Sequence, residues 1–258
     1  MLFRSGGLEI LPYIDFDVIK ANPKIFTGFS DTTSHHFVLH KAGLISYYGL
    51  SVMDNLGEYG EINPYTKAML EAMLISPSEE LSIEASPYRS DDEHRLSWSE
   101  ENSRLKREVF ENTGYELIQG KGIVEGELLG GCIEVLIKLM ETSLWPGIEE
   151  WKNKILLIET YNQSFDELRA SVRALNKIHI FDVIKGIIVG RPSQDERYDG
   201  YKDIYKEVIG KEANRPEMPI LYNVNVGHAY PIGLLGLGLR YEINCNNIAL
   251  TLKEPGTK

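Results

Sequence analysis

Short apolar runs alternate with polar, glycine-containing turns along the first fifty residues of the chain. Residues 8–20 mix apolar and acidic positions in a pattern that favours helix and turn over strand. Residues 24–27 predict a short strand, and the segment after the next turn, 32–42, predicts a helix that ends at Gly43. Residues 44–48 predict another strand. This order is typical of a βαβ unit, so we expect an α/β fold in which a parallel sheet carries a ligand site at its strand ends.

The second half of the chain carries the strongest strand patterns. Apolar runs at 155–159, 186–190 and 219–223 predict buried strands, and the alternating tail at 238–252 predicts a terminal hairpin. The glycines spread over 118–132 favour short strands and turns. Helices are predicted at 61–74, with Asn63 as cap and Pro64 at the first position, and at 133–141, 165–179 and 199–210.

Charged and polar residues dominate the stretch from Ser76 to Gly114, and this change in composition predicts an excursion between two domains. The predicted division places an N-terminal α/β domain at 1–85, a linker at 86–117 and a C-terminal domain at 118–258. A chain of 258 residues is long enough for this arrangement without disulfide support.

Composition narrows the class of protein. The net charge is -11, from 38 acidic and 27 basic residues, which argues against a general nucleic-acid binder. The two cysteines, Cys132 and Cys245, do not suggest a disulfide framework, and a reducing compartment is the simpler reading. No apolar run reaches the roughly 18 residues of a membrane span, and the first residues lack the apolar core of a signal peptide. We therefore expect a cytoplasmic protein that does not bind membranes.

Ser30 occupies the turn Gly28-Phe29-Ser30-Asp31, between a predicted strand and the following helix. Free N–H groups at a helix start, together with the helix dipole, stabilise negative charge, so the position suits a nucleophile whose reaction forms an oxyanion. The turn resembles a nucleophile elbow, although Thr32 stands where that motif has its second glycine. The alternative role is helix capping, for which serine is common.

Two more residues lie at predicted strand ends. Glu159 ends a buried apolar run, where it can orient a histidine, or else cap a helix or pair with a surface lysine. His228 follows Gly227 in a loop after a strand, where it can act as a general base for Ser30 or serve a structural role. Taken together, a serine, an acid and a histidine at three strand ends predict a catalytic triad.

Several other residues carry weaker chemical signals. His36 and His40 lie four residues apart on a predicted helix, but Phe37 stands where a zinc peptidase has its glutamate, so we expect structural histidines and no metal site. Arg191, at a strand end, can hold a carboxylate or be structural. Trp98 lies in a polar stretch, where it can stack on a ligand ring or cover the joint between domains.

The chain as a whole resembles the LD-carboxypeptidase family of serine peptidases, and within it the microcin C7 self-immunity branch. The matching segments follow the order of the family through nearly the whole sequence, and the spacing between Glu159 and His228 also fits. Each segment alone is unspecific, but the set is specific. The segments are LPYIDFDVIKANPKIFTGFSDTT, KAGLISYYGLSVM, LLGGCIEVL, ILLIETYN, GIIVGR and NVNVGHAYPIGLLGLG.

The resemblance implies a triad of Ser30, Glu159 and His228 that hydrolyses an amide next to a free carboxylate, without a cofactor. It implies a Rossmann-like N-terminal α/β domain that carries the serine, and an α+β C-terminal domain with a small β-barrel-like sheet that carries the other two residues. Family members are cytoplasmic and usually dimeric. Their substrates are small: murein tetrapeptides in peptidoglycan recycling, or a peptidyl or aminoacyl nucleotide in the immunity branch.

The resemblance also implies substrate contacts. The backbone N–H of Asp31 would form half of the oxyanion hole, and Gly7, from the pair Gly6-Gly7, would supply the other half. Trp98 corresponds to a tryptophan that stacks on the nucleobase in the immunity branch, which favours that branch. Cys132 replaces an asparagine of the family pattern GGN, so the substrate contact at this position differs.

Family members have about one further βαβ region before the LPYID segment, so we expect an incomplete N-terminal sheet with an exposed edge. An active serine carboxypeptidase is the first hypothesis. A catalytically impaired, ligand-binding homologue is the second. A nucleotide-binding α/β protein, in which Ser30 only caps a helix, is the third.

Overall fold

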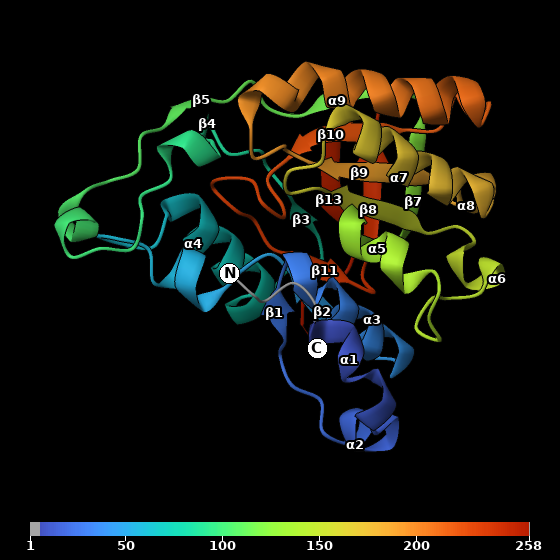
Figure 1. Cartoon of the computed structure of the whole chain (residues 1–258), viewed down its shortest axis with the longest axis horizontal. Helices are drawn as coiled ribbons and strands as arrows, with labels where there is room; N and C mark the ends of the chain where they lie inside the picture. The colour runs from blue at the N-terminus through green and yellow to red at the C-terminus, as the bar shows by residue number, and fades with distance from the viewer. Residues whose placement is uncertain (1–5, 258) are drawn as a thin grey trace.

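An eight-stranded mixed sheet organises the part of the chain that the computed structural model describes, residues 6–257 (Figure 1). Its four central strands run parallel, and antiparallel strands extend it on both sides. In spatial order the strands are β3 (Leu81–Ser82), β13 (Ala249–Leu252), β12 (Arg240–Asn244), β7 (Ile123–Cys132), β8 (Ile155–Glu159), β9 (Gly186–Gly190), β10 (Ile220–Val224) and β6 (Glu116–Gln119).

Both faces of the central strands are buried, which explains their almost uninterrupted apolar sequences. Along β8, Leu156 and Ile158 belong to one core, whereas Ile155 and Leu157 belong to the other. Helices cover the first face (Figure 1): α5 (Ile133–Leu139), α7 (Phe165–Lys177) and α9 (Tyr198–Tyr205), with the shorter α6 (Ile148–Trp151) and α8 (Ile180–Val183) beside them.

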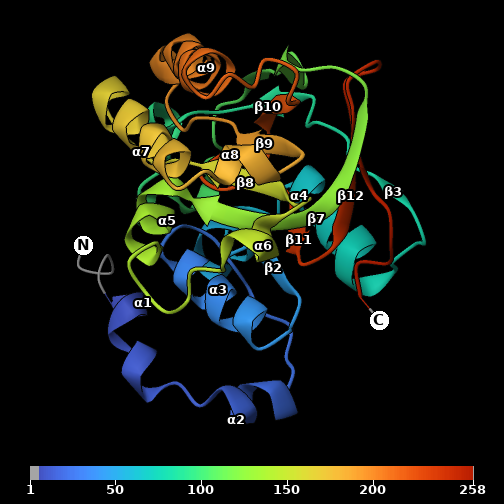
Figure 2. The ribbon, with the colours of Figure 1, turned by 90° about the vertical axis from the view of Figure 1, so that its right-hand side faces the viewer.

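The sheet curls around its second face into a half-barrel, and Figure 2 shows the long strand β7 bending through this curve. The second core lies inside the curve and includes Leu128, Leu221 and Leu250. A small three-stranded sheet packs against it, in the order β1 (Thr27–Gly28), β2 (Ser46–Tyr48) and β11 (Leu235–Leu237). The predicted α/β class, with a parallel N-terminal unit and a curved C-terminal sheet, is therefore confirmed.

The predicted βαβ unit is present at the N-terminal side of the molecule. Strand β1 leads into α3 (Thr33–Lys41), and β2 returns parallel to β1. Gly43, just past the helix, has a φ of 76°, as the predicted glycine stop requires. The segment before β1 forms the short helices α1 (Gly6–Glu9) and α2 (Phe16–Ala21), as the helix-and-turn pattern of residues 8–20 predicts.

The helix predicted at 61–74 begins as expected. It forms α4 (Pro64–Leu70) and continues as one wider helical turn, Glu71–Ile75. The side chain of Asn63 accepts a hydrogen bond from the Tyr65 N–H, which caps the helix start. The helix predicted at 199–210 likewise forms α9 and a wider helical segment, Lys206–Glu212.

The prediction of short strands and turns over 118–132 was wrong for most of that stretch. After a turn at Gly120 and Gly122, both with positive φ, the chain forms the single ten-residue strand β7. The later glycines mark close approaches between backbones. A Cβ on Gly126 would lie 2.4 Å from the Asn153 carbonyl oxygen, and one on Gly130 would lie 2.1 Å from that of Leu157.

The polar stretch forms an excursion that leaves the body of the molecule, at the left of Figure 1. It contains a two-stranded ribbon of β4 (Tyr88–Arg89) and β5 (Phe110–Glu111), with short 3₁₀ turns at Asp92–His94 and Glu101–Arg104. Within residues 6–257, no helix is both long and apolar enough to cross a membrane.

Candidate active site

Glu159 and His228 meet at the carboxyl ends of the parallel strands. Glu159 is the last residue of β8 and is 1% exposed, and His228 follows β10 by four residues. The His228 Nδ1 donates to the Glu159 Oε2 over 2.6 Å. Gly227 makes this approach possible, because a Cβ at that position would lie 2.4 Å from the Glu159 Cδ. The bond fixes the imidazole with its Nε2 available as a base.

The electrostatics of this pair stabilise its charged form. Burial alone raises the pKa of the Glu159 carboxyl, but the charge and hydrogen bond of His228, with a hydrogen bond from Tyr48, hold that pKa below its ordinary value. Burial lowers the pKa of His228, but the neighbouring Glu159 carboxylate outweighs burial and raises it above 6.5. A histidine of this kind accepts a proton readily and holds it on the ring.

Ser30 lies in a strained turn between β1 and α3. Its φ is 63°, in the left-handed region that non-glycine residues rarely adopt, as expected for a nucleophile elbow. The capping role is not observed, because Thr32 occupies the N-cap position of α3. Instead, the hydroxyls of Thr32 and Thr33 donate to the carbonyls of Phe29 and Ser30, which fixes the turn from the helix side.

The serine turn contacts the histidine through its neighbour. The Phe29 ring packs edge-on against the His228 ring, with 5.1 Å between the centroids. On another side, the Tyr161 ring lies 4.7 Å from the same imidazole at a tilt of 37°. Two aromatic rings and one carboxylate therefore define the orientation of His228, which leaves the imidazole 12% exposed.

Tyr48 links the serine turn to Glu159, a contact that the sequence pattern does not predict. Its hydroxyl donates to the Glu159 Oε1 over 2.6 Å and accepts the Ser30 N–H over 3.0 Å. The pKa of Tyr48 is raised well above 10, first by burial and then by the Glu159 charge, so the hydroxyl keeps its proton. One signal was available: Tyr48 ends the strand predicted next after the serine turn.

Three further predicted contact residues surround the turn. Asp31 follows Ser30 directly, and its carbonyl accepts the Ser34 hydroxyl. Gly7, in α1, packs against the same helix start, since a Cβ there would lie 2.2 Å from the Ser34 Oγ. Cys132 ends β7 beside Glu159 in the parallel register and is 3% exposed.

Cys132 behaves as a buried thiol. Burial, with the nearby Glu159 and Glu134 carboxylates, raises its pKa well above 9. The Cys132 Sγ donates to the Glu134 Oε2 over 3.0 Å, while the Glu134 Oε1 accepts from the Thr160 hydroxyl and the Tyr161 N–H. These bonds attach the loop after β8 to the start of α5.

Trp98 lies on the excursion, between the turns at Asp92–His94 and Glu101–Arg104. Its side chain is 51% exposed, and its ring packs 5.0 Å from that of Tyr59. The Tyr59 hydroxyl donates to the Ser99 carbonyl over 2.9 Å, which ties the tip of the excursion to the body. The exposed part of the indole is available for stacking.

The other candidates have structural partners. The buried His36 contacts the Ser46 hydroxyl and the Gly28 carbonyl, and burial lowers its pKa to about 4. His40 contacts Glu150 over 2.7 Å. Arg191 is 5% exposed and donates to Asn223 and Asp195. Within residues 6–257, no group of three or more His, Cys, Asp or Glu side chains is arranged to hold a metal ion.

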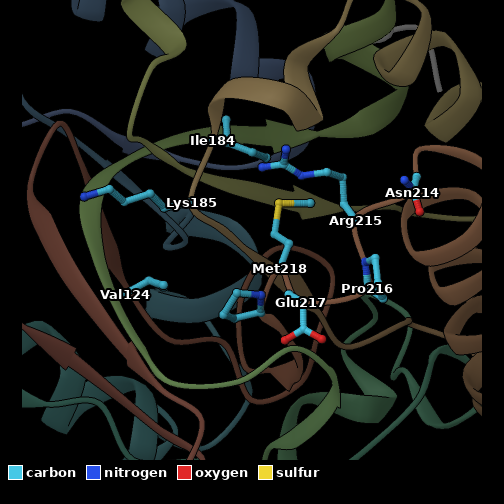
Figure 3. A pocket seen from close by; sticks show the side chains of 9 residues that line it. Val124, Ile184, Lys185, Asn214, Arg215, Pro216, Glu217 and Met218 are labelled. Atoms are coloured by element: carbon cyan, nitrogen blue, oxygen red, sulfur yellow. The ribbon is translucent and has the colours of Figure 1, made fainter.

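A pocket of about 430 Å³ opens at the opposite edge of the sheet (Figure 3). It lies where β9 and β10 begin, whereas Glu159 and His228 lie where parallel strands end. A five-residue strand spans roughly 16 Å, so this pocket is remote from the site described above. Its lining residues are Val124, Ile184, Lys185, Asn214, Arg215, Pro216, Glu217, Met218 and Pro219.

Comparison with known families matches two parts of the chain. The N-terminal domain of LD-carboxypeptidases matches residues 5–49, which include the serine turn. The C-terminal domain of the same family matches residues 125–243, which include Glu159 and His228. The first match therefore contains the serine turn, and the second contains the Glu159–His228 pair.

Individual relatives agree. The chain is 27% identical to the microcin C7 self-immunity protein MccF of Escherichia coli, over 95% of this chain and 70% of MccF. A solved structure of MccF in complex with aspartyl sulfamoyl adenosine superposes with a TM-score of 0.80 at 25% identity, covering 95% of this chain and 72% of that one.

Two more comparisons are at 30% identity. A crystal structure of an MccF-like protein from Streptococcus pneumoniae in complex with AMP superposes with a TM-score of 0.84, covering 95% of this chain and 74% of that one. The Bacillus subtilis relative YocD, named as a carboxypeptidase, matches 92% of this chain and 70% of its own length. Both domain matches and these relatives lead to one conclusion: the chain belongs to the LD-carboxypeptidase family of peptidases.

Proposed function

We propose that this chain is a serine carboxypeptidase that hydrolyses an amide next to a free carboxylate, with Ser30 as nucleophile, His228 as general base and Glu159 as the acid that orients it. The observation that carries the proposal is the buried 2.6 Å bond between Glu159 and His228, linked through Tyr48 to the strained serine turn. A buried acid–histidine pair near a serine turn is an arrangement suited to acyl transfer.

The chemistry follows from these positions. The His228 Nε2 removes the proton of the Ser30 hydroxyl as its Oγ attacks the substrate carbonyl. The Glu159 carboxylate stabilises the imidazolium that forms. The backbone N–H groups of Asp31 and Gly7 stabilise the oxyanion. His228 then gives its proton to the departing nitrogen, the C–N bond breaks, and water hydrolyses the acyl-enzyme by the same steps.

We propose an aminoacyl or peptidyl nucleotide as the substrate. Relatives with the same fold are described in complex with AMP and with aspartyl sulfamoyl adenosine, so small nucleotide-linked ligands suit this architecture. The half-exposed Trp98 offers a face on which a nucleobase can stack. Cys132 lies beside Glu159, where it would border the scissile bond. A murein tetrapeptide is the alternative substrate, and the experiment below separates the two.

The remaining expectations are part of the same proposal. We propose a cytoplasmic homodimer in which residues 1–85 supply the serine, 118–258 supply the acid and histidine, and 86–117 connect them. Light scattering on the purified chain tests the dimer, and a single species at the monomer mass of 29.3 kDa would contradict it.

The decisive experiment replaces Ser30 with alanine. We expect the unaltered chain to release aspartate from aspartyl sulfamoyl adenosine, and Ser30→Ala to lower kcat roughly 10⁴-fold or more while it leaves thermal unfolding unchanged. Mass spectrometry of the products measures turnover by both proteins, and the same assay is carried out in parallel with a murein tetrapeptide. Ser143→Ala is the matched control, since Ser143 is an exposed serine in the segment between α5 and α6. Equal turnover by the Ser30 variant would contradict the proposal.

A further inference from the structure

Tyr48 lies at the point where three strand ends converge. It is the last residue of β2, and its side chain is completely buried. Its single hydroxyl touches groups from three elements: the Ser30 N–H after β1, the Thr33 hydroxyl at the start of α3, and the Glu159 carboxylate at the end of β8. Burying a phenol at this position is favourable because its proton is donated to Glu159 and its oxygen accepts the Ser30 N–H.

The same hydroxyls hold the backbone of Ser30. The left-handed conformation at φ 63° is strained for a non-glycine residue, so it persists only where the surroundings fix it. The Ser30 N–H donates to the Tyr48 oxygen, and the Ser30 carbonyl accepts the Thr33 hydroxyl over 2.7 Å. Both backbone polar groups of the serine are therefore bound to side chains of this cluster.

Strand β7 completes the cluster. The Cys132 N–H donates to the Thr33 Oγ1 over 3.0 Å. Just before it, Gly131 has a φ of 149°, and a Cβ there would lie 2.8 Å from the Tyr48 Cε2 and 2.7 Å from the Thr33 Oγ1. A glycine is thus required at this position for the two hydroxyls to reach the serine turn. The cluster joins residues on both sides of the polar excursion.

We propose that Tyr48 is a positioning residue of the reaction: its hydroxyl, together with that of Thr33, holds the serine turn in its reactive conformation and fixes that turn relative to Glu159. This inference rests on the function proposed above and goes beyond the triad. Tyr48 does not act on the substrate; it acts through Ser30 and Glu159. The hydrogen bond from Tyr48 to the Glu159 Oε1 also reduces the negative charge on the carboxylate. Glu159 therefore stabilises the protonated form of His228 less strongly.

The test removes one oxygen atom at a time. Tyr48→Phe deletes the hydroxyl that joins Ser30 and Glu159. Tyr47→Phe is the matched control, because the neighbouring Tyr47 is also buried and its hydroxyl donates over 2.7 Å to the Gly256 carbonyl, outside this cluster. Thr33→Val deletes the second hydroxyl, and Thr33→Ser restores it.

Two readouts are needed. The first is the rate at which a fluorophosphonate labels Ser30, followed by intact-protein mass spectrometry, which does not depend on the natural substrate. The second is kcat and KM for aspartyl sulfamoyl adenosine across pH. We expect Tyr48→Phe to slow labelling and kcat by roughly 10- to 100-fold with KM nearly unchanged. We also expect the acid limb of its pH profile to move to higher pH, because Glu159 then binds the His228 proton more strongly.

The outcomes separate this inference from the proposed function. Thr33→Val should slow labelling in the same direction, and Thr33→Ser should recover most of the rate. If Ser30→Ala is inactive while Tyr48→Phe matches Tyr47→Phe in rate and in pH profile, the positioning role is wrong and the triad stands. If the unaltered chain is neither labelled at Ser30 nor active, the proposed function itself is wrong.

Discussion

His228 and Glu159 form a buried pair in which each residue shifts the pKa of the other. The pKa of His228 is raised against the effect of burial by the Glu159 carboxylate, so the imidazole holds its proton to a higher pH than a free histidine does. A protonated imidazole is no base. We therefore expect kcat/KM to rise with pH through an apparent pKa above 6.5.

Initial rates on aspartyl sulfamoyl adenosine, from about pH 5 to pH 9, measure this limb. Glu159→Gln is the comparison, because a neutral amide cannot stabilise the imidazolium. We expect it to move the acid limb to lower pH and to reduce kcat by roughly 10⁴-fold. An acid limb in the same place for both proteins would show that another group is the base.

The sequence pattern predicts candidate catalytic residues only where they lie at the ends of strands. Ser30, Glu159 and His228 each follow an apolar run, and the carboxyl ends of parallel strands meet at one edge of a sheet. Phe29 and Tyr48 were missed, because an aromatic residue in an apolar segment is indistinguishable from an ordinary core residue. Their roles depend on contacts with residues more than a hundred positions away, and periodicity carries no information about such contacts.

At the level of elements, β7 illustrates where glycine content misleads. The glycines of 118–132 predict short strands separated by turns, but Gly130 and Gly131 lie inside one long strand. They pack against Leu157 and against the Thr33–Tyr48 cluster, and both have φ near 148°. Sequence alone does not distinguish a glycine that is needed for a turn from one that is needed because another chain segment packs against its backbone. The two differ only in their neighbours in the folded structure.

Gly130 offers a test at this scale. It faces Leu157 in the parallel register, so the added methyl of Gly130→Ala collides with the backbone of β8 and pushes β7 away from the strand that ends at Glu159. We expect the free energy of unfolding in urea to fall by about 2–4 kcal/mol. Gly147→Ala is the control: no atom lies within 4 Å of its added Cβ. An equal decrease in the free energy of unfolding for the two variants would show that the contact between Gly130 and β8 does not contribute to stability.

At the scale of the whole molecule, segments far apart in the sequence form the site together. Strand β11 follows the histidine loop and pairs antiparallel with β2, where Leu235 lies opposite Tyr48. The small sheet that carries the serine turn therefore includes a strand from the C-terminal end of the chain. The sequence pattern predicted the strands β1 and β2 but not this partner, because a three-residue strand in a glycine-rich segment has no distinctive periodicity.

Buried amides attach the excursion to the same region. Asn112 donates to the Ser86 carbonyl over 2.8 Å, and Asn223 donates to the Asn112 Oδ1 over 2.9 Å. Asn225, three residues before His228, accepts the Ser86 N–H over 2.9 Å. Both ends of the excursion are therefore bound to the segment that leads from β10 to His228.

Asn225 is the residue through which this attachment can be tested. It is 2% exposed, and besides accepting the Ser86 N–H it donates to the Pro231 carbonyl over 3.2 Å. Asn225→Ala leaves both groups buried without their partner, and each such group costs about 1–3 kcal/mol. We expect a loss of unfolding free energy in that range or above it, measured in urea.

The His228 loop should also become less ordered in Asn225→Ala, so fluorophosphonate labelling of Ser30 should slow even at temperatures where the variant is fully folded. Asn246→Ala, in the exposed turn between β12 and β13, is the control and should change stability by no more than about 0.5 kcal/mol. If Asn225→Ala unfolds at the same urea concentration as Asn246→Ala and reacts at the same rate, the amide contacts do not couple the excursion to the site. The reactivity of the serine would then depend on the two sheets alone.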